Sequence, residues 1–400
     1  MSSSLLTIDM ITRKSLQILE NELVLTRNVN RQYDDSFAVQ GAKIGSTLRI
    51  RKPDRALVTD GAALQVQDDN EQFTTLTVSS QKHIGVNFTS AELTMQLDDF
   101  ADRVLKPRIS QLAASIDADV ANAYKSIYQS VGTPGTTPAT SLVLLQGQQK
   151  LNEAAAGMNP RYATVNPAAN AGLVEGMKGF FNPQGTISRQ FKSGMMGEGV
   201  LGYDEINMSQ SITNHTTGEW GTTITSTGTI ATQGSTSLPI SFTGSSKTWA
   251  VGDVFTVAGV YAVNPQTRQS TGSLQQFVVT AAVTGSSTAT LTVSPPMYTA
   301  DQALATIDAF PQATAVVTML GTASTGYAQN LIYHKDAITF ATADLLLPQG
   351  VDMASRQSHN GISMRIVRQY DINNDRMPCR IDVLYGYSVI RPEMASRLWG

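Results

Sequence analysis

WAVGDVFTVAGVYAVNPQTRQSTGSLQQFVVTAAVTGSSTATLTVSPP, residues 249–296, is the stretch that decides how the chain is organised. Charge is almost absent around it: between positions 220 and 300 the only charged residues are Lys247, Asp253 and Arg268. Threonine and valine favour strands, and the glycines and the Asn-Pro pair mark turns at short intervals. The composition therefore predicts a small all-β module over residues 220–305.

The segments on either side of this module have a different pattern. Residues 141–219 contain a helical stretch, SLVLLQGQQKLNEAAAG, and a strand-like stretch, RYATVNP. After about residue 330 the mixed pattern returns and ends in the strand patterns MRIVRQYDI and RIDVLYGYSVIRPE. A β module enclosed by mixed segments predicts an α+β protein in which the module is inserted into another domain.

A long segment rich in charged residues, from about residue 45 to residue 88, comes earlier in the chain. Leu48 and Ile50 alternate with arginines, and Leu76 and Val78 repeat the same period of two, which is typical of half-exposed strands. The residues between these strands are rich in charge and turn formers. We expect an extended two-stranded loop from about residue 45 to residue 88, which is only marginally stable on its own.

Opposite charges gather within this loop and leave two interpretations open. The basic group consists of Arg49, Arg51, Lys52 and Arg55, and the acidic pair is Asp68 and Asp69. The loops of neighbouring copies meet through these charges, or the charges pair within one solvated hairpin, where each pair contributes only about 0–1 kcal/mol. Arg268, in the loop AVNPQTRQSTGSL, is likewise either an intersubunit contact or part of an exposed turn.

Two helices are predicted before the mixed region. Residues 7–27 place apolar side chains at spacings of three to five, so an amphipathic helix begins an N-terminal arm that reaches away from the main body. Its apolar stripe needs a surface to lie on, and a neighbouring copy is one source of that surface. A capping-box spacing between Thr89 and Glu92 starts a further helical pattern. From Pro107 to Val131 one apolar face continues for 25 residues, or about 37 Å, which predicts a long spine helix.

The motifs of catalysis and metal binding give little support to an enzyme. GEGVLG, with Gly197, Gly199 and Gly202, matches a dinucleotide fingerprint but lacks the strand before it and the helix after it, so we interpret it as a loop. The four histidines are scattered, and no nucleophile elbow, GK[ST] loop or HExxH motif occurs. We therefore expect no catalytic residues, cofactor or metal.

The overall composition limits the remaining classes. A formal net charge of -3 gives no reason to expect direct nucleic-acid binding. The single cysteine, Cys379, excludes an intrachain disulfide and is expected to be inert packing. No export signal or membrane-spanning stretch is apparent, so we expect a protein without membrane contact.

Taken in this order, the parts of the chain resemble the major capsid protein of tailed bacteriophages. The stretch at 249–296 resembles the insertion domain of P22-type coat proteins, and YGYSVIRPE at 385–393 resembles their closing segment. FFNPQ at 180–184 and YHKDAI at 333–338 are similar to phrases common in these proteins. The resemblance runs from the arm to the C-terminus, with its specific phrases in about a quarter of the chain.

The resemblance implies an HK97-like capsid fold of the α+β class. The implied boundaries are an N-terminal arm at 1–40, an extended loop at 41–88, a spine helix and peripheral domain at 89–140, a first axial part at 141–219, an inserted β-barrel-like domain at 220–305, and the axial remainder with closing peripheral strands at 306–400. In the resembled family the insertion aids folding of its host domain and contacts a neighbouring capsomer. Covalent crosslinking of the kind some such capsids use is not carried over, because Lys52 has no identifiable partner.

The implied function is self-assembly of hexamers and pentamers into an icosahedral shell around double-stranded DNA. The implied partners are further copies of the chain, a scaffolding protein, a portal and possible decoration proteins, while the DNA is contained without sequence-specific binding. The implied location is the virion, after assembly in the host cytoplasm. Two other classes stay as alternatives: a secreted β-rich adhesin or carbohydrate-binding protein using the threonine-rich module, and a nucleotide-dependent enzyme using GEGVLG.

Overall fold

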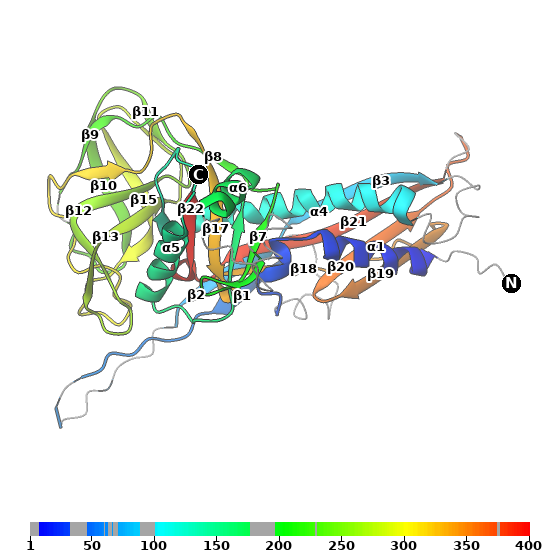
Figure 1. Cartoon of the computed structure of the whole chain (residues 1–400), viewed down its shortest axis with the longest axis horizontal. Helices are drawn as coiled ribbons and strands as arrows, with labels where there is room; N and C mark the ends of the chain where they lie inside the picture. Colours follow the sequence, from blue (N-terminus) through cyan, green and yellow to red (C-terminus); the bar gives the residue numbers. More distant parts are fainter. Residues whose placement is uncertain are drawn as a thin grey trace. The chain divides into compact units, whose positions relative to one another are not determined.

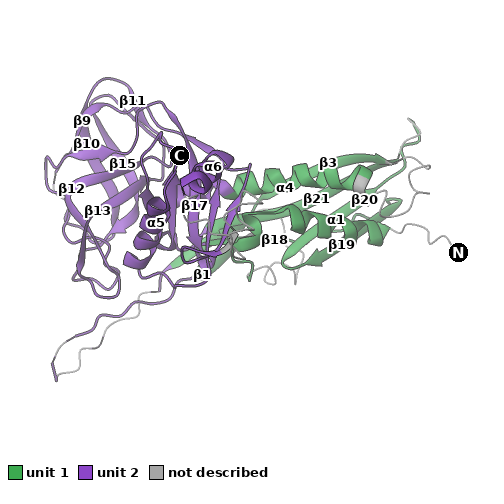
Figure 2. Ribbon diagram, viewed as in Figure 1, with its two compact units in different colours: residues 1–50, 73–120, 338–388 green, residues 51–72, 121–337, 389–400 purple. Residues whose placement is uncertain are grey.

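The computed structural model of the chain describes residues 8–32, 46–59, 61–62, 66, 71–88, 101–176, 197–228, 230–373 and 377–400. The chain forms two compact units, each assembled from segments far apart in the sequence (Figure 2). Unit 1 comprises residues 1–50, 73–120 and 338–388. Unit 2 comprises residues 51–72, 121–337 and 389–400. The predicted α+β class is confirmed, because both helices and sheets are present.

Unit 1 is organised around a five-stranded sheet. Its strands are β3 (Ser80–Phe88), β18 (Ile338–Thr342), β19 (Met353–His359), β20 (Ile362–Arg368) and β21 (Met377–Val389). The order is β18-β21-β20-β19, and β3 also pairs with β21. Residues 80–88 were predicted to be part of the extended loop, but they are antiparallel to β21 with Ile84 opposite Ile381. Among the described residues of the loop, β1 (Ser46–Arg51) pairs with β2 (Phe73–Val78), and the N–H of Lys52 donates to the carbonyl of Gln72 at 2.7 Å.

Two helices pack on this sheet (Figure 1). Helix α1 (Ile8–Glu22) lies across β19 and β20, and its residues Leu16 and Leu19 are fully buried there. The amphipathic helix was predicted, and the surface that covers its apolar stripe is the chain's own β19–β20 hairpin and not a neighbouring copy. Helix α4 (Lys106–Ala121) follows the π-helical turn η3 (Ala101–Leu105) and runs along β3 and β21.

The spine helix ends earlier than predicted, before the helical spacing of apolar residues stops. Helix α4 ends at Ala121, the chain tightens into a 3₁₀ turn, η4 (Asn122–Ser126), and Ile127 is extended with φ -93° and ψ 120°. Tyr124, Ile127 and Val131 keep the helical spacing and are buried, but they lie in unit 2 rather than on the helix. The part of the pattern at residues 89–100 lies outside the described residues.

Unit 2 contains a seven-stranded sheet that carries two helices. The strands are β4 (Ser130–Val131), β5 (Arg161–Val165), β6 (Gly197–Val200), β7 (Tyr203–Met208), β8 (Asn214–Thr216), β17 (Gly326–His334) and β22 (Ala395–Trp399). Their order is β4-β22-β17-β5-β7-β6, with β8 on β17. Helices α5 (Ser141–Glu153) and α6 (Pro167–Gly176) bury Leu144, Leu151 and Leu173 in the same core as Ile332 and Leu398. The short 3₁₀ turns η6 (Lys335–Ala337) and η7 (Pro392–Met394) belong to this unit, whereas η1 (Thr26–Asn28) follows α1 in unit 1.

The inserted β module forms a second sheet within unit 2. Its strands are β9 (Thr222–Ser226), β10 (Ser235–Thr243), β12 (Val254–Val263), β13 (Ser270–Val279), β15 (Thr288–Met297) and β16 (Val317–Met319), in the order β16-β12-β13-β15-β10-β9. A small sheet of β11 (Lys247–Trp249) and β14 (Val283–Gly285) accompanies it. A bridge between Thr225 and Val316 joins the two edges, so the sheet closes into a barrel. Because β16 lies beyond residue 305, the strands of the module extend farther than predicted.

The barrel core explains the low charge of its sequence. Phe255, Phe277 and Trp249 are at most 1% exposed, and the two phenylalanine rings stack with centroids 5.7 Å apart. Inward side chains of β12 and β13 alternate with Thr, Ser and Gln, and a charge inside so small a core would require a partner. Asp253, immediately before β12, is the exception: it is buried and has such partners.

Candidate functional site

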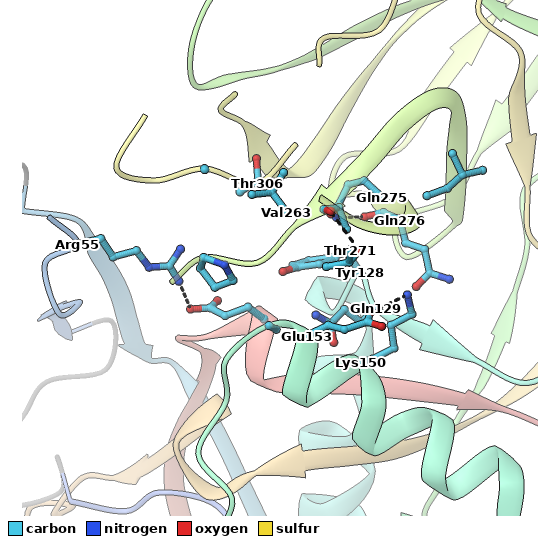
Figure 3. Close-up of a pocket in the computed structure, with 16 residues that line it drawn as sticks. Arg55, Tyr128, Gln129, Lys150, Glu153, Val263, Thr271, Gln275, Gln276 and Thr306 are labelled. Atoms are coloured by element: carbon cyan, nitrogen blue, oxygen red, sulfur yellow. Dashed lines mark hydrogen bonds and ion pairs between the residues drawn. The ribbon is translucent and has the colours of Figure 1, made fainter. Parts of the chain in front are cut away.

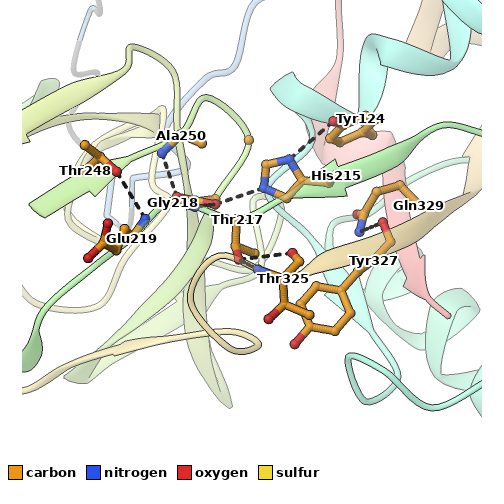
Figure 4. A network of polar contacts seen from close by, with 12 residues as sticks. Tyr124, His215, Thr217, Gly218, Glu219, Thr248, Ala250, Thr325, Tyr327 and Gln329 are labelled. Atoms are coloured by element: carbon orange, nitrogen blue, oxygen red, sulfur yellow. Dashed lines mark hydrogen bonds and ion pairs between the residues drawn. The ribbon is translucent and has the colours of Figure 1, made fainter.

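The first candidate site is the neck at which the β module leaves its host sheet (Figure 4). The chain leaves at β8 and returns at β17, and these two strands pair with each other. Just beyond them the backbone N–H of Thr217 donates to the carbonyl of Thr325 at 3.1 Å, and the Thr217 hydroxyl donates to the carbonyl of Thr322 at 2.7 Å. The two connections of the module are therefore fastened side by side.

Asp253 ties the barrel to this neck. Its carboxylate accepts hydrogen bonds from the backbone N–H of Ala250 at 2.7 Å, from that of Gly218 at 3.2 Å, and from Nε2 of His215 at 2.9 Å. Gly218 lies so close to β11 that a Cβ there would stand 2.4 Å from the Thr248 carbonyl oxygen, so only glycine fits. The side chains of Asp253 and His215 are 0% and 3% exposed, so no soluble substrate reaches this pair.

A tyrosine and an arginine complete the neck. The Tyr124 hydroxyl lies 3.3 Å from Nδ1 of His215 (Figure 4). The Arg397 guanidinium lies over the Tyr124 ring, 5.2 Å from its centroid, and donates to the carbonyls of Ile127 at 2.7 Å and Gly252 at 2.6 Å. Burial lowers the pKa of Arg397 to about 9 and raises the pKa of Tyr124. The arrangement is a buried polar network that holds three segments of unit 2 to the barrel.

The second candidate site is the base of the extended loop, where most of the sequence-predicted contact residues lie. The Arg49 guanidinium carbon stands 3.8 Å from the centroid of the Phe73 ring, a cation–π contact across the β1–β2 pair. Arg51 pairs with Glu71 at 2.9 Å, with the two side chains 76% and 49% exposed. These two arginines thus have intramolecular contacts on the exposed side of the loop.

Arg55 and Lys52 line two adjacent cavities of unit 2. Arg55 pairs with Glu393 at 3.3 Å, and both residues line a cavity of about 60 Å³ and a second cavity of about 180 Å³. In Figure 3, Arg55 enters from the extended loop, Lys150 and Glu153 stand on α5, and Thr306 lies opposite. Lys52 lines the larger cavity only. Burial lowers the pKa of Lys52; the nearby Glu393 opposes this shift, and Arg55 and Arg391 add to it.

The remaining predicted residues are not part of this cluster. Arg268 has a φ of 57° in the β12–β13 loop, and its guanidinium donates to the carbonyl of Val58 at 3.3 Å, which joins the barrel to the extended loop within one chain. Asp68 and Asp69 lie outside the described residues. The intersubunit role of the whole set stays a prediction.

Sequence reasoning missed the residues that complete both sites. His215, Tyr124 and Arg397 come from segments up to 273 positions apart, and Glu393 is 338 positions from Arg55, so no spacing rule connects them. One signal was available: Asp253 is the single carboxylate between positions 220 and 300. A lone acid in an apolar β module indicates a buried residue with fixed partners.

The structure places the GEGVLG segment, the metal-binding residue types and Cys379, on which the chemical expectations depended. GEGVLG forms the β6–β7 hairpin, with φ of 67° at Gly199 and 76° at Gly202, and not the loop we predicted. Because a strand follows the glycines where a dinucleotide site requires a helix, the fingerprint is contradicted. Among the described residues, no group of three or more His, Cys, Asp or Glu is placed to hold a metal ion. Burial raises the pKa of Cys379 to about 12.

The helices of the described part of the chain are all too short or too polar to cross a membrane. A comparison with protein families gives a match over nearly the whole chain: the model of the P22 coat protein, gene protein 5, matches residues 2–400. The chain belongs to the P22 coat protein family. It is 20% identical over 414 residues to the major capsid protein of Acyrthosiphon pisum secondary endosymbiont phage 1, covering 98% of this chain and 97% of that relative.

Solved structures are similar over most of the chain. A structure from Mycobacterium phage Che8 is 11% identical, with a TM-score of 0.46, and the match covers 94% of this chain and 90% of that one. The capsid structure of the cyanophage P-SCSP1u is also 11% identical, with a TM-score of 0.41 and coverage of 90% and 85%. Membership of the P22 coat protein family confirms the resemblance stated from the sequence and the HK97-like fold that it implies. The protein is a phage capsid protein and a component of the virion.

Proposed function

We propose that copies of this chain assemble as hexamers and pentamers into the icosahedral shell that encloses the double-stranded DNA of a tailed phage. The observation that carries the proposal is the match of the P22 coat protein family to residues 2–400. The related protein covered over 97% of its length is itself named a major capsid protein. The family is structural and not a class of enzymes, and we propose no catalytic activity for this chain.

The extended loop supports an assembly role on physical grounds. Its described residues include exposed charged and apolar side chains: Arg51, at the end of β1, is 76% exposed, and Val58 and Val66, between the two strands, are 81% and 85% exposed. Such a two-stranded segment buries little of its own surface. When many copies meet in closed symmetry, weak contacts of this kind act together and stabilise the whole assembly.

We propose the domain roles that the family implies, with two boundaries changed: residues 80–88 belong to the sheet of unit 1, and the barrel extends to β16. The N-terminal arm, the extended loop, the spine helix with the peripheral domain, the axial domain and the inserted barrel each take the part that P22-type coat proteins give them. Scaffolding protein, portal and decoration proteins are proposed partners, and assembly is proposed to take place in the host cytoplasm. The wall contains DNA without sequence-specific contacts, in keeping with a net charge of -3.

We expect the purified chain, expressed together with its neighbouring phage genes, to form closed shells or free hexamers and pentamers. Negative-stain electron microscopy combined with sedimentation measures this directly. Expression of the chain alone is the comparison, and it tells whether a scaffold is required. A stable monomer under both conditions contradicts the proposal.

The basic residues of the loop, Arg49, Arg51, Lys52 and Arg55, are proposed to meet acidic groups of a neighbouring copy, with Asp68 and Asp69 as the loop's own acidic pair. Arg51 gives the cleanest test, because its exposed pair with Glu71 contributes at most about 1 kcal/mol to folding. We expect Arg51→Glu to leave the thermal unfolding of the subunit nearly unchanged and to lower the yield of shells severalfold, measured by sedimentation.

The matched control is the charge swap Arg51→Glu with Glu71→Arg, which restores the intramolecular pair. If repulsion between two neighbouring glutamates causes the loss, the swap restores assembly and the intersubunit role is refuted. If Arg51 meets another copy, the swap stays defective. Arg268 is tested in the same way: an unchanged particle yield after Arg268→Ala assigns it to its contact with Val58 alone.

A further inference from the structure

The larger cavity at the base of the extended loop is built as a receptor for a single side chain. Its volume of about 180 Å³ holds a few waters or one acidic side chain, but no chain segment. Four parts of unit 2 wall it: Lys52, Pro53 and Arg55 of the loop, Tyr128, the C-terminal segment around Arg391, and the end of β15 with residues 298–306.

The charges around this cavity do not balance. Its lining contains three cations, Lys52, Arg55 and Arg391, and one carboxylate, Glu393. Glu393 is already paired with Arg55 at 3.3 Å. In the described part of the chain Lys52 and Arg391 have no ion pair of their own, and the contact of Arg391 Nη1 with the Met394 sulfur, at 3.5 Å, is to a weak acceptor. Like charges held together in a partly buried site favour binding of an anion.

The remaining walls suit the aliphatic part of an acidic residue. Pro295, Pro296 and Leu304 present apolar surface, and Tyr298 and Tyr128 add aromatic faces. Pockets of this kind, mostly apolar with a few convergent charged groups, are typical of specific recognition. An arginine and a lysine on one side of such a pocket bind a carboxylate with charge-assisted hydrogen bonds.

We infer that this pocket binds the carboxylate of an aspartate or glutamate presented by a second copy of the chain. The second copy is chosen because the loop at whose root the pocket lies also carries Val58 and Val66, two apolar residues more than 80% exposed, and exposed apolar side chains on this loop suit contact with protein. This inference rests on the proposed shell function and assigns a defined receptor within it.

The test measures the concentration of free subunit that coexists with shells, by sedimentation of the full chain assembled with its phage partners. Lys52→Met removes one charge at nearly constant length, and we expect the free-subunit concentration to rise about tenfold, since a hydrogen bond to a charged group contributes about 1.5–3 kcal/mol. Arg391→Met is expected to act in the same direction. Lys52→Arg, which keeps the charge, is the control and is expected to assemble as the wild type does.

Electron cryomicroscopy of the wild-type shell supplies the second readout, independent of any variant. The inference requires a carboxylate oxygen of another copy within 4 Å of the Lys52 ammonium or the Arg391 guanidinium. Shells in which the pocket is empty, holds only a small anion, or lies against DNA overturn the inference while the shell function stands. Unchanged assembly of Lys52→Met also overturns the inference. If the wild-type chain forms no shells, both the inference and the proposed shell function are wrong.

Discussion

Replacing Asp253 with alanine is expected to lower the free energy of unfolding of unit 2 by about 3–5 kcal/mol, which is the usual cost of removing one partner from a buried charged network. The carboxylate is 0% exposed and accepts three hydrogen bonds, from Ala250, Gly218 and His215. Its loss leaves these donors buried without an acceptor, and each such group costs about 1–3 kcal/mol. For a unit of this size the thermal midpoint falls by about 10 °C, measurable by calorimetry.

Two further measurements tell whether the loss of stability comes from the hydrogen bonds of Asp253 or from the loss of a negative charge in general. Asp301 is an exposed acid of the same module, and Asp301→Ala is expected to change stability by no more than about 0.5 kcal/mol. A double-mutant cycle of Asp253→Ala with His215→Ala is expected to give a coupling energy of about 1–3 kcal/mol, because the two side chains share one hydrogen bond. If the Asp253→Ala protein is as stable as the wild type, the hydrogen bonds of Asp253 do not stabilise the junction between the barrel and its host sheet.

The neck also marks the limit of what the sequence predicts. Composition identified the β module, because threonine, valine and glycine without charge are typical of short strands packed in a small barrel. Its end was placed too early because β16 has three residues, Val317–Met319, too few to show a period of two. Contacts such as His215 with Asp253 are set by the closed barrel and not by spacing.

The spine helix was predicted correctly from its apolar spacing, but its end was placed too late because the same spacing continues after the helix stops. Ile109, Leu112 and Ile116 are buried on α4 as the period of the helix predicts. Tyr124 and Val131 continue the same spacing, yet Tyr124 contacts His215 in the neck and Val131 packs with the core of the seven-stranded sheet. Periodicity reports that a residue is buried; it does not report which partner buries it.

The intersubunit role of the candidate contact residues stays a prediction, and the sequence indicated only which of them lie close together. The clustering of Arg49, Arg51, Lys52 and Arg55 follows from their proximity in sequence, and local contacts such as Arg51 with Glu71 lie across one hairpin. The partner of Arg55 is Glu393, near the other end of the chain, and only the tertiary fold brings the two together. The surface on which the helix of the arm lies could not be predicted either, since an apolar stripe does not identify the surface that covers it.

Replacing Asp117 with alanine is expected to destabilise unit 1 by about 3 kcal/mol or more and to loosen the chain after α1. Asp117, on α4, is 2% exposed and accepts the backbone N–H groups of Val24 at 2.7 Å and Thr26 at 3.0 Å, together with the Thr26 hydroxyl at 2.5 Å. These N–H groups stand at the start of the 3₁₀ turn η1, where the first donors of a helical turn have no partner within it, and alanine offers none. Urea unfolding of the subunit measures the loss.

Hydrogen exchange tells whether Asp117→Ala loosens only the segment after α1 or weakens the packing of unit 1 as a whole. The amides of Val24 and Thr26 are expected to lose protection in Asp117→Ala, while Asp117→Asn, which keeps one carbonyl oxygen, retains part of it. Gln111→Ala is the control on the same helix: its side chain is exposed, so we expect a change of no more than about 0.5 kcal/mol. If the amides at 24–26 stay protected in Asp117→Ala, the carboxylate does not hold this segment, because protection of those amides depends on the acceptor of their N–H groups.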